Sequence, residues 1–395
     1  MKVAEKEKCT GCGSCYNVCP VNAISMKEDR EGFLRPAIDE RLCTNCGLCS
    51  KVCPEVSNYE AKGFKKPTVY AAWNLDEAVR INSSSGGIFS VLSDYILEQG
   101  GVVFGAAFDE KLKVKHIPVF RKEELYKLRG SKYVQSEINN SFSQVREYLD
   151  ENKKVLFSGT PCQVAGLLSF LGKDPPNLLT CDFVCHGVLS PKVFVGYLRY
   201  LGQENNSKVT KIYFRDKRFG WDNFSVHVTF KNNKEYTVSP RKDKFFRGFA
   251  MSVYLRPSCS ICRYAKIPRV GDISLGDFWG IGEEQKFTYN THDGVSMVLI
   301  NSTKGEDIFD LCRDRCFIKQ RELKEAVKNN AHLSLPSKAS KYRTIFFSIF
   351  NRKGFAAASK KYSGNGIIKR IVTKIVGSKI IKIIEWGRFM LFKKT

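Results

Sequence analysis

The sequence predicts an α+β protein in which a small cysteine-rich module precedes a mixed α/β core and a basic, amphipathic helical tail. Three observations support this order of parts. Cysteines repeat within residues 1–60, short apolar strands alternate with helical segments over 68–330, and basic residues gather over 335–395. The chain has 395 residues, of which 43% are hydrophobic, so it can bury the cores of about two or three domains.

Two cysteine runs with the same spacing, C-x2-C-x2-C-x3-C-P, begin at Cys9 and Cys43. In such a run three thiolates hold one iron-sulfur cube and the fourth cysteine binds the other cube. Glycines inside the runs let backbone amides approach the cluster sulfides, and the prolines end the ligand loops. The spacing therefore predicts two [4Fe-4S] clusters in a bacterial-type dicluster ferredoxin module over 1–60. The expected ligand sets are Cys9, Cys12 and Cys15 with Cys53, and Cys43, Cys46 and Cys49 with Cys19.

The cysteine pattern also excludes other classes of site. Zinc takes four ligands in two separated pairs, which two runs of four do not provide. Eight of the fifteen cysteines lie in the runs, and the odd remainder of seven, without a signal peptide, argues against a disulfide framework. We therefore expect a cytoplasmic protein whose clusters exchange single electrons with the rest of the chain.

The core is expected to begin after a polar linker over 60–67. A strand over 68–73 leads to a Ser-Ser-Gly-Gly turn at 84–87, which precedes a helix whose apolar residues recur at helical spacing. Backbone amides at this helix start would suit a phosphate or a carbonyl-rich ring, whereas a plain capped helix is the structural alternative. Strands over 101–108 and 113–119 follow, and this first α/β region is expected to span 68–150.

A second α/β region is expected over 151–330. Its first strand ends in a Gly-Thr-Pro turn at 159–161 before Cys162, and its next strand ends in Cys185-His186-Gly187. Strand ends of this kind are where α/β proteins usually place their chemistry. An antiparallel meander is expected over 209–238.

Three separated turns offer a further set of cysteines. Cys162 and Cys185 lie at strand ends, and Cys259 and Cys262 form a C-x-x-C turn that is half of a metal site. Together these residues could supply four ligands. A small buried hydrophobe is the alternative for each, and it is the favoured interpretation of the three cysteines that remain.

Several motifs that follow one another along the chain carry a family resemblance. They are Ser-Ser-Gly-Gly at 84–87, Gly-Ser-Lys-Tyr-Val-Gln at 130–135, Gly-Thr-Pro-Cys-Gln at 159–163, Cys-His-Gly at 185–187, the C-x-x-C turn at 259–262, and Gly-Asp-Ile-Ser-Leu-Gly-Asp-Phe-Trp-Gly at 271–280. Over residues 70–325 the chain resembles the coenzyme F420 hydrogenase/dehydrogenase beta-subunit family. Members of that family bind FAD and a [4Fe-4S] cluster and pass electrons between clusters and a two-electron carrier or substrate.

The resemblance implies a flavin-binding core with a third cluster. The implied cluster ligands are Cys162, Cys185, Cys259 and Cys262, and the implied FAD site is lined by Ser84, Ser85, Gly86, Gly87, Lys132, Gly159, Thr160 and Pro161. Four further residues are candidates by their own chemistry. His186 is a tentative catalytic acid, with a structural hydrogen bond as the alternative. Asp277 could bind a ribityl or substrate hydroxyl or cap a turn, and Arg215 and Arg218 could neutralise an anionic ligand or form a solvated basic face.

These features predict an iron-sulfur flavoprotein oxidoreductase that passes electrons between a low-potential donor such as ferredoxin and a two-electron carrier or substrate. Because the chain carries its own cluster pair, its layout is closer to stand-alone relatives, such as those that reduce a hydroxymethyl chlorophyll, and to versions found among polysaccharide-assembly enzymes. A role in polysaccharide biosynthesis is therefore one expectation. The alternative is a non-catalytic electron-transfer subunit that docks on a catalytic partner, and a third class is a basic scaffold with decayed clusters.

The formal charge of +24 is concentrated in the tail. Residues 335–395 hold fifteen Lys or Arg and one acid, which is +14, and leave +10 for the rest of the chain. Apolar residues over 367–376 fall on one side of a helix with basic residues opposite, and aromatic residues follow over 386–392. This pattern predicts an in-plane helix on an anionic membrane at its cytoplasmic face, although a helix docked on a partner subunit would show the same stripe. No uncharged apolar run reaches the ~18 residues that span a bilayer, and no nucleic-acid-binding motif was found, so nucleic acid is not expected as a partner.

Overall fold

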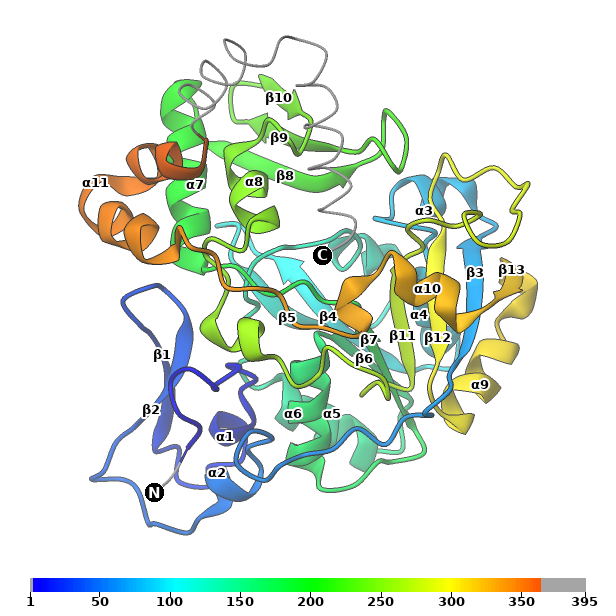
Figure 1. The fold of residues 1–395 in the computed structure, drawn as a ribbon. Coiled ribbons are helices and arrows are strands. Elements are labelled where there is room, and N and C mark those ends of the chain that lie inside the picture. The colour runs from blue at the N-terminus through cyan, green and yellow to red at the C-terminus, as the bar shows by residue number, and fades with distance from the viewer. Residues whose placement is uncertain (1–2, 364–395) are drawn as a thin grey trace.

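An eight-stranded mixed β-sheet forms the centre of the structure, a computed structural model that describes residues 3–363 (Figure 1). Its strands are β3 (Thr68–Asn74), β4 (Val102–Phe108), β5 (Val114–Val119), β6 (Val155–Gly159), β7 (Leu178–Phe183), β11 (Ile273–Asp277), β12 (Ser296–Ile300) and β13 (Cys316–Arg321). They are ordered β13-β3-β12-β11-β7-β6-β4-β5. The four strands β4, β6, β7 and β11 are parallel, and the outer ones pair antiparallel. Both predicted α/β regions therefore contribute to one sheet.

Helices cover both faces of this sheet. Leu156 of β6 packs on one side with α4 (Ile88–Glu98) and α9 (Thr303–Asp310). Val155 and Phe157 of the same strand pack on the other side with α5 (Ser141–Asp150) and α6 (Pro161–Leu171). A strand covered on both faces needs apolar residues at successive positions, which is why β6 begins with three buried apolar residues in a row. The predicted strands over 68–119 and the helix after the turn at 84–87 are confirmed.

A smaller antiparallel sheet packs beside the main one, with strand order β10-β9-β8. It is formed by β8 (Val209–Asp216), β9 (Ser225–Phe230) and β10 (Glu235–Val238), which confirms the predicted meander, and it packs with α7 (Pro191–Glu204), α8 (Lys244–Ala250) and α11 (Arg343–Ser363). Aromatic side chains dominate this second core, among them Phe194, Phe245 and Phe346. The remaining helices are α3 (Glu77–Ile81), α10 (Leu323–Lys328) and short 3-10 turns at η1 (Lys122–Lys127), η2 (Pro257–Ile261), η3 (Arg313–Arg315) and η4 (Ala331–Leu333).

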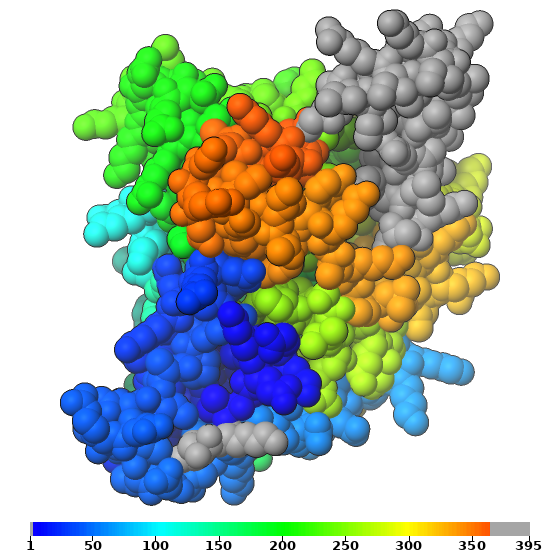
Figure 2. All heavy atoms as spheres, turned by 60° about the vertical axis from the view of Figure 1, so that its left-hand side comes forward, coloured from blue at the N-terminus to red at the C-terminus, as the bar shows by residue number. Residues whose placement is uncertain are grey.

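The cysteine-rich module lies against the edge of the α/β body and below α11 (Figures 1 and 2). It contains α1 (Ser14–Asn17), β1 (Ile24–Glu28), β2 (Leu34–Ile38) and α2 (Leu48–Lys51), and β1 pairs antiparallel with β2. Arg343 at the start of α11 forms an ion pair with Glu31 in the β1–β2 turn. Lys192 of α7 donates to the Arg30 carbonyl at 3.2 Å and to Asn351 at 2.9 Å. The module is thus fixed to the core by polar contacts at its hairpin.

Part of the predicted tail can be compared with the structure. Residues 343–363 form α11, which packs on α7 and α8. The predicted in-plane membrane helix, over 367–392, lies outside the described residues. Within residues 3–363, no helix combines the length and the apolar character needed to cross a bilayer.

Candidate functional site

The first cysteine set, Cys9, Cys12, Cys15 and Cys53, is gathered at the inner side of the module. All four side chains are buried, with exposed fractions of 8–9%. Burial raises the pKa of the Cys12 thiol to about 11, and charge on Cys53 and Cys9 adds to the shift. Burial also raises the pKa of Cys15, again with contributions from Cys12, Cys9 and Cys53. The predicted pairing of the first run with Cys53 is therefore consistent with the positions of these thiols.

The second cysteine set lies at the outer side of the module. Cys19, Cys43, Cys46 and Cys49 line one small cavity together with apolar side chains that include Ile24, Ile38 and Leu48. Cys46 is exposed, whereas Cys49 is buried. Of the two sets in the module, this one therefore faces solvent.

The third cysteine set is built from three segments that are distant in sequence. Cys162 lies in the first turn of α6, Cys185 follows β7, and Cys259 and Cys262 lie in and directly after η2. Burial raises the pKa of Cys162, and charge on the other three thiols raises it further. Burial likewise raises the pKa of Cys259 to about 11, with Cys262 contributing. The structure thus brings the four predicted residues together, while their assignment as ligands stays a prediction.

Local hydrogen bonds hold the third set in place. Thr160 caps α6 in a reciprocal arrangement with Gln163, whose side chain accepts from the Thr160 amide at 3.0 Å. The Thr160 hydroxyl lies 3.1 Å from the Cys162 sulfur. The Val188 amide, just after the Cys-His-Gly turn, donates to the Cys259 sulfur at 3.5 Å. The Gly-Thr-Pro turn, predicted to line a flavin, therefore also positions Cys162.

Among residues 3–363 no group of three or more His, Cys, Asp or Glu meets the geometry of a metal site. Around zinc all four ligands bind one atom, whereas the cysteines around a cubane bind separate iron atoms. The exclusion of zinc stays a prediction from the sequence.

The first and third sets are neighbours along one face of α6. A Cβ atom added to Gly166 of α6 would lie 3.0 Å from the Cys12 sulfur and 2.8 Å from its Cβ. The Ser14 hydroxyl also donates to the Gly166 carbonyl at 2.8 Å. Only glycine permits so close an approach between this helix and the cysteine loop. The contact places Cys12 one helical turn from Cys162.

The predicted Ser-Gly turn is engaged with the sheet. Ser84 accepts a hydrogen bond from the Ser131 amide at 2.8 Å, and Gly86 donates to Ser296 at 3.0 Å. A Cβ on Gly86 would lie 2.4 Å from the Ala72 carbonyl oxygen, so a side chain is excluded there. Gly87 begins α4 with a left-handed φ of 85°. The turn leads into α4, which no side chain caps at this end, and its assignment to a flavin stays a prediction.

Lys132 lies in a buried position close to this turn. Its ammonium donates to the carbonyls of Lys127, Leu128 and Arg129 at 3.1, 2.9 and 2.7 Å. Burial lowers the pKa of Lys132 to about 7. The side chain therefore caps the end of η1 in addition to any role toward a ligand.

Asp277 and Arg215 form a buried ion pair that the sequence did not reveal. Arg215 donates to both Asp277 oxygens at 2.7 and 2.9 Å, and Trp221 donates to the same carboxylate at 2.6 Å. The Arg215 side chain is 5% exposed, so the default expectation of a solvated basic face is wrong for this residue. It holds for Arg218, which is 40% exposed and pairs with Asp216. The Nε atom of Arg215 is buried without a partner.

His186 has both ring nitrogens engaged within the protein. Nδ1 lies 2.8 Å from Nε2 of His332, and Nε2 lies 3.1 Å from the Phe249 carbonyl oxygen. Burial lowers the pKa of His186 to about 3. A ring held neutral between two partners favours the structural alternative over the tentative catalytic role. His332 was missed in the sequence because nothing local connects it to residue 186.

Comparisons with known proteins identify three matching family descriptions. Residues 8–56 match a 4Fe-4S dicluster domain, and residues 69–142 and 152–326 match the N-terminal and C-terminal parts of the coenzyme F420 hydrogenase/dehydrogenase beta subunit. One subunit of the F(420)H(2) dehydrogenase of Methanosarcina mazei is 23% identical over 338 residues, covering 81% of this chain and 86% of that protein.

Two further similarities differ in coverage. Coenzyme F420-dependent sulfite reductase of Methanocaldococcus jannaschii is 30% identical over 319 residues; these cover 78% of this chain but 46% of that protein, so the chain spans about half its length. Among solved structures, a chain of the F420-reducing [NiFe] hydrogenase complex from Methanosarcina barkeri aligns with a TM-score of 0.46 and 20% identity, covering 77% of this chain and 94% of that one.

Proposed function

The chain belongs to the coenzyme F420 hydrogenase/dehydrogenase beta-subunit family and carries an N-terminal 4Fe-4S dicluster domain, and from this premise we propose that it is an iron-sulfur electron-transfer subunit of an oxidoreductase complex. The observation that carries the proposal is the meeting of four core cysteines beside the first cysteine set. A core that only supported a ferredoxin would not need a third group of partly buried thiols at the contact.

The three cysteine sets are arranged from the surface inward. An electron from a redox partner such as a ferredoxin or a catalytic subunit enters at the second set, where Cys46 is exposed. Leu42 and Leu48 beside it are 53% and 37% exposed, which gives a partner an apolar contact. Clusters held by the first and third sets would extend this path along one face of α6. Each would supply one-electron transfer, in either direction.

The donor chemistry of the third set fits a [4Fe-4S] cluster. Thiols buried together keep their protons because burial and mutual repulsion raise the pKa of each. A metal centre supplies the positive charge that allows all four to bind as thiolates. The Thr160 hydroxyl and the Val188 amide are placed to donate to two of these sulfurs.

FAD is the proposed link between the clusters and a two-electron carrier. Arg215 donates to the Ser84 carbonyl at 3.2 Å, so its buried, unpartnered Nε lies near the turn at 84–87 and the start of α4, a combination that suits an anionic or carbonyl-rich ligand. A bound flavin exchanges two electrons with a carrier and single electrons with clusters. Lys132, Ser84 and Asp277 would hold this group through the positions described above, and His186 would hold the Cys185 turn.

A subunit is favoured over a self-sufficient enzyme by one observation. The relative whose length the chain matches almost fully is named as a subunit of F(420)H(2) dehydrogenase. We therefore propose a catalytic partner chain and a carrier of the coenzyme F420 type. The roles in polysaccharide biosynthesis and at a membrane surface stay predictions from the sequence.

Cofactor analysis of the anaerobically reconstituted chain tests the proposal. Three clusters require about twelve irons per chain, and the flavin requires one FAD. Cys162→Ser should remove about four irons and leave the other two clusters, whereas Cys312→Ser, at a buried cysteine outside the three sets, should remove none. Eight irons in the parent chain, or equal iron in Cys162→Ser and the parent, would refute the third cluster. Turnover of a two-electron carrier by the isolated chain would favour the self-sufficient enzyme.

A further inference from the structure

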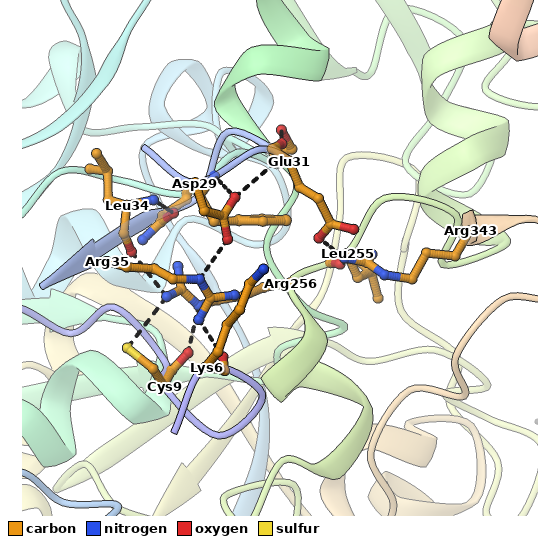
Figure 3. Close-up of polar contacts among 12 residues, drawn as sticks. Lys6, Cys9, Asp29, Glu31, Leu34, Arg35, Leu255, Arg256 and Arg343 are labelled. Carbon is orange, nitrogen blue, oxygen red and sulfur yellow. Dashed lines mark hydrogen bonds and ion pairs between the residues drawn. The ribbon is translucent and has the colours of Figure 1, made fainter. Parts of the chain in front are cut away.

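Arg256 lies between the first and third cysteine sets and contacts both. Its guanidinium Nε donates to the Cys9 carbonyl at 2.7 Å, and Nη2 lies 3.5 Å from the Cys9 sulfur (Figure 3). Its own carbonyl accepts the Cys259 amide at 3.0 Å. The side chain is 1% exposed. The guanidinium therefore contacts Cys9 of the first set, and the backbone of the same residue contacts Cys259 of the third set.

Two buried donors near this point have no partner in the protein. They are Nη1 of Arg256 and Nε2 of Gln135. A Cβ added to Gly11 would lie 2.7 Å from the first and 2.5 Å from the second, so both converge on the loop that carries Cys9 and Cys12. Leaving such donors unpaired inside a protein is costly. Their convergence on the loop of Cys9 and Cys12 indicates that a cluster bound by this loop would supply the missing hydrogen-bond acceptor.

The charge of Arg256 is also uncompensated by carboxylates. The neighbouring acids are already used, since Asp29 pairs with Arg35 at 2.5 Å and Glu31 pairs with Arg343 (Figure 3). Within the described part of the chain, Arg256 forms no ion pair with an acid. Burying a lone cation is expensive unless an anion is close. A cluster with four thiolates carries negative charge and would provide that anion.

The position of the guanidinium is fixed from several sides. The Arg256 amide donates to the Val188 carbonyl at 2.9 Å. Its Nη2 donates to the Leu34 carbonyl at 3.0 Å, and the Leu34 amide donates to Gln135 at 3.1 Å. Strand β2 of the module is therefore held by the same two side chains that approach the Cys9 loop. This fixes the cation relative to the first set.

The second set has no comparable cation among the residues that the structure describes. Its nearest arginine on the chain, Arg41, pairs with Asp39 and is 89% exposed, and Cys46 itself is exposed. Water can compensate added negative charge at the second set but not at the buried first set. Without a fixed cation, an electron would be more stable on the exposed cluster than on the buried one.

We propose that Arg256, assisted by Gln135, raises the reduction potential of the first cluster so that an electron entering at the second cluster moves inward. In this step the second cluster is oxidised and the first is reduced by one electron, and no bond or proton is exchanged. Arg256 is a positioning residue, because it holds a positive charge beside the first cluster and takes no part in the chemistry of a substrate. The inference rests on the proposed clusters.

Redox titration of the full-length chain, followed by electron paramagnetic resonance, tests this role. Arg256→Met should shift one reduction wave to a lower potential. The equilibrium constant for reducing that cluster should fall at least tenfold, which corresponds to a shift of about 59 mV for one electron. Arg256→Lys keeps the charge and should leave that wave within about threefold of the parent. Gln135→Met should lower the same wave by less than Arg256→Met. Arg41→Gln, the matched exposed cation in the same module, should move no wave.

The direction of the shift separates this role from a purely structural one. If Arg256 only docked the module, its loss would admit water to the first cluster, and a more polar environment would raise the wave. An unmoved or raised wave in Arg256→Met, or a wave lowered equally in Arg256→Lys, would refute the proposal. If Arg256→Met loses iron, the other two variants decide the question. A lowered wave in Gln135→Met together with an unmoved wave in Arg256→Lys supports the proposal, and any other pair of results refutes the proposal. Failure of the cluster assignment itself would appear as missing iron and missing waves in the parent chain.

Discussion

Replacing Asp182 by Asn is expected to dismantle the third cysteine set while leaving the other two intact. Asp182 lies near the end of β7, three residues before Cys185, and its carboxylate pairs with Arg269 at 2.8 Å. Both side chains are buried, with exposed fractions of 0% and 1%. Arg269 also donates to the Tyr264 carbonyl at 3.0 Å, which fixes the segment that follows Cys262.

The size of the effect follows from the contacts that the amide cannot make. One Asp182 oxygen accepts from Arg269 and Ser274, and the other accepts from the amides of Val270 and Gly271 at 3.3 and 3.0 Å. In Asp182→Asn the side-chain NH₂ would replace one of these two oxygens, and in either position it would face a hydrogen-bond donor instead of an acceptor. Breaking one partner of a buried pair costs about 3–5 kcal/mol. That is a large share of the ~5–15 kcal/mol that stabilises a typical folded domain.

The assay combines the free energy of unfolding in denaturant with iron content. Asp182→Asn should lose about 3–5 kcal/mol of unfolding free energy and about four irons. Asp216→Asn is the matched control, because its pair with Arg218 is partly exposed and should contribute no more than about 1 kcal/mol. Replacing Asp182 and Arg269 together by Leu should cost less than Asp182→Asn alone, since no charge is left unpaired.

The reasoning is refuted if Asp182→Asn is no less stable than Asp216→Asn. It is also refuted if Asp182→Asn loses stability but keeps every iron, because the pair would then not support the third set. A loss of all iron would show that the three sets fold as one unit, in contrast to the expected local effect.

Three further predictions address the entry point, the acid stability and the tail. Cys46→Ser should remove the exposed second cluster and slow reduction by an external one-electron donor at least tenfold, while the first and third clusters keep their signals; unchanged reduction kinetics would contradict entry at this site. Burial lowers the pKa of His116 from 6.5 to about 4. Between these pH values the unfolded chain therefore binds a proton that the folded chain does not bind. The free energy of unfolding should fall by about 2 kcal/mol from pH 6.5 to pH 5. His116→Gln should remove that part of the pH dependence and exposed His292→Gln should not, as measured by denaturant titration at both pH values. A chain that ends at Ser363 should lose flotation with anionic vesicles that the full chain shows, whereas equal flotation of both chains would contradict the membrane prediction for the tail.

Local patterns accounted for most of what could be predicted from the sequence. The dicluster domain and the strands over 68–119 depend on spacing within a few residues; a family match over 8–56 supports the first, and the structure contains the second. The convergence of Cys162, Cys185 and the C-x-x-C turn depends on the order of strands in the sheet. It could be expected only from the motifs of the family.

Contacts between segments that are distant along the chain could not be predicted from the sequence. Arg256 carries no local signal, because its partners Cys9 and Leu34 lie in a module more than 200 residues away. The default assignment of Arg215 to a solvated face failed for the same reason. Its position within β8 gave no indication that Asp277, on another sheet, would bury it.

Spin coupling between the first and third clusters tests the central claim most directly. The contact between Gly166 and Cys12 places these two cysteine sets side by side along one face of α6, so reduced clusters in them should interact magnetically. We predict that the fully reduced chain shows a split or broadened resonance spectrum, and that Cys162→Ser reduces it to separate signals of the two module clusters. A parent spectrum that is already the sum of isolated signals would contradict the proposed electron path.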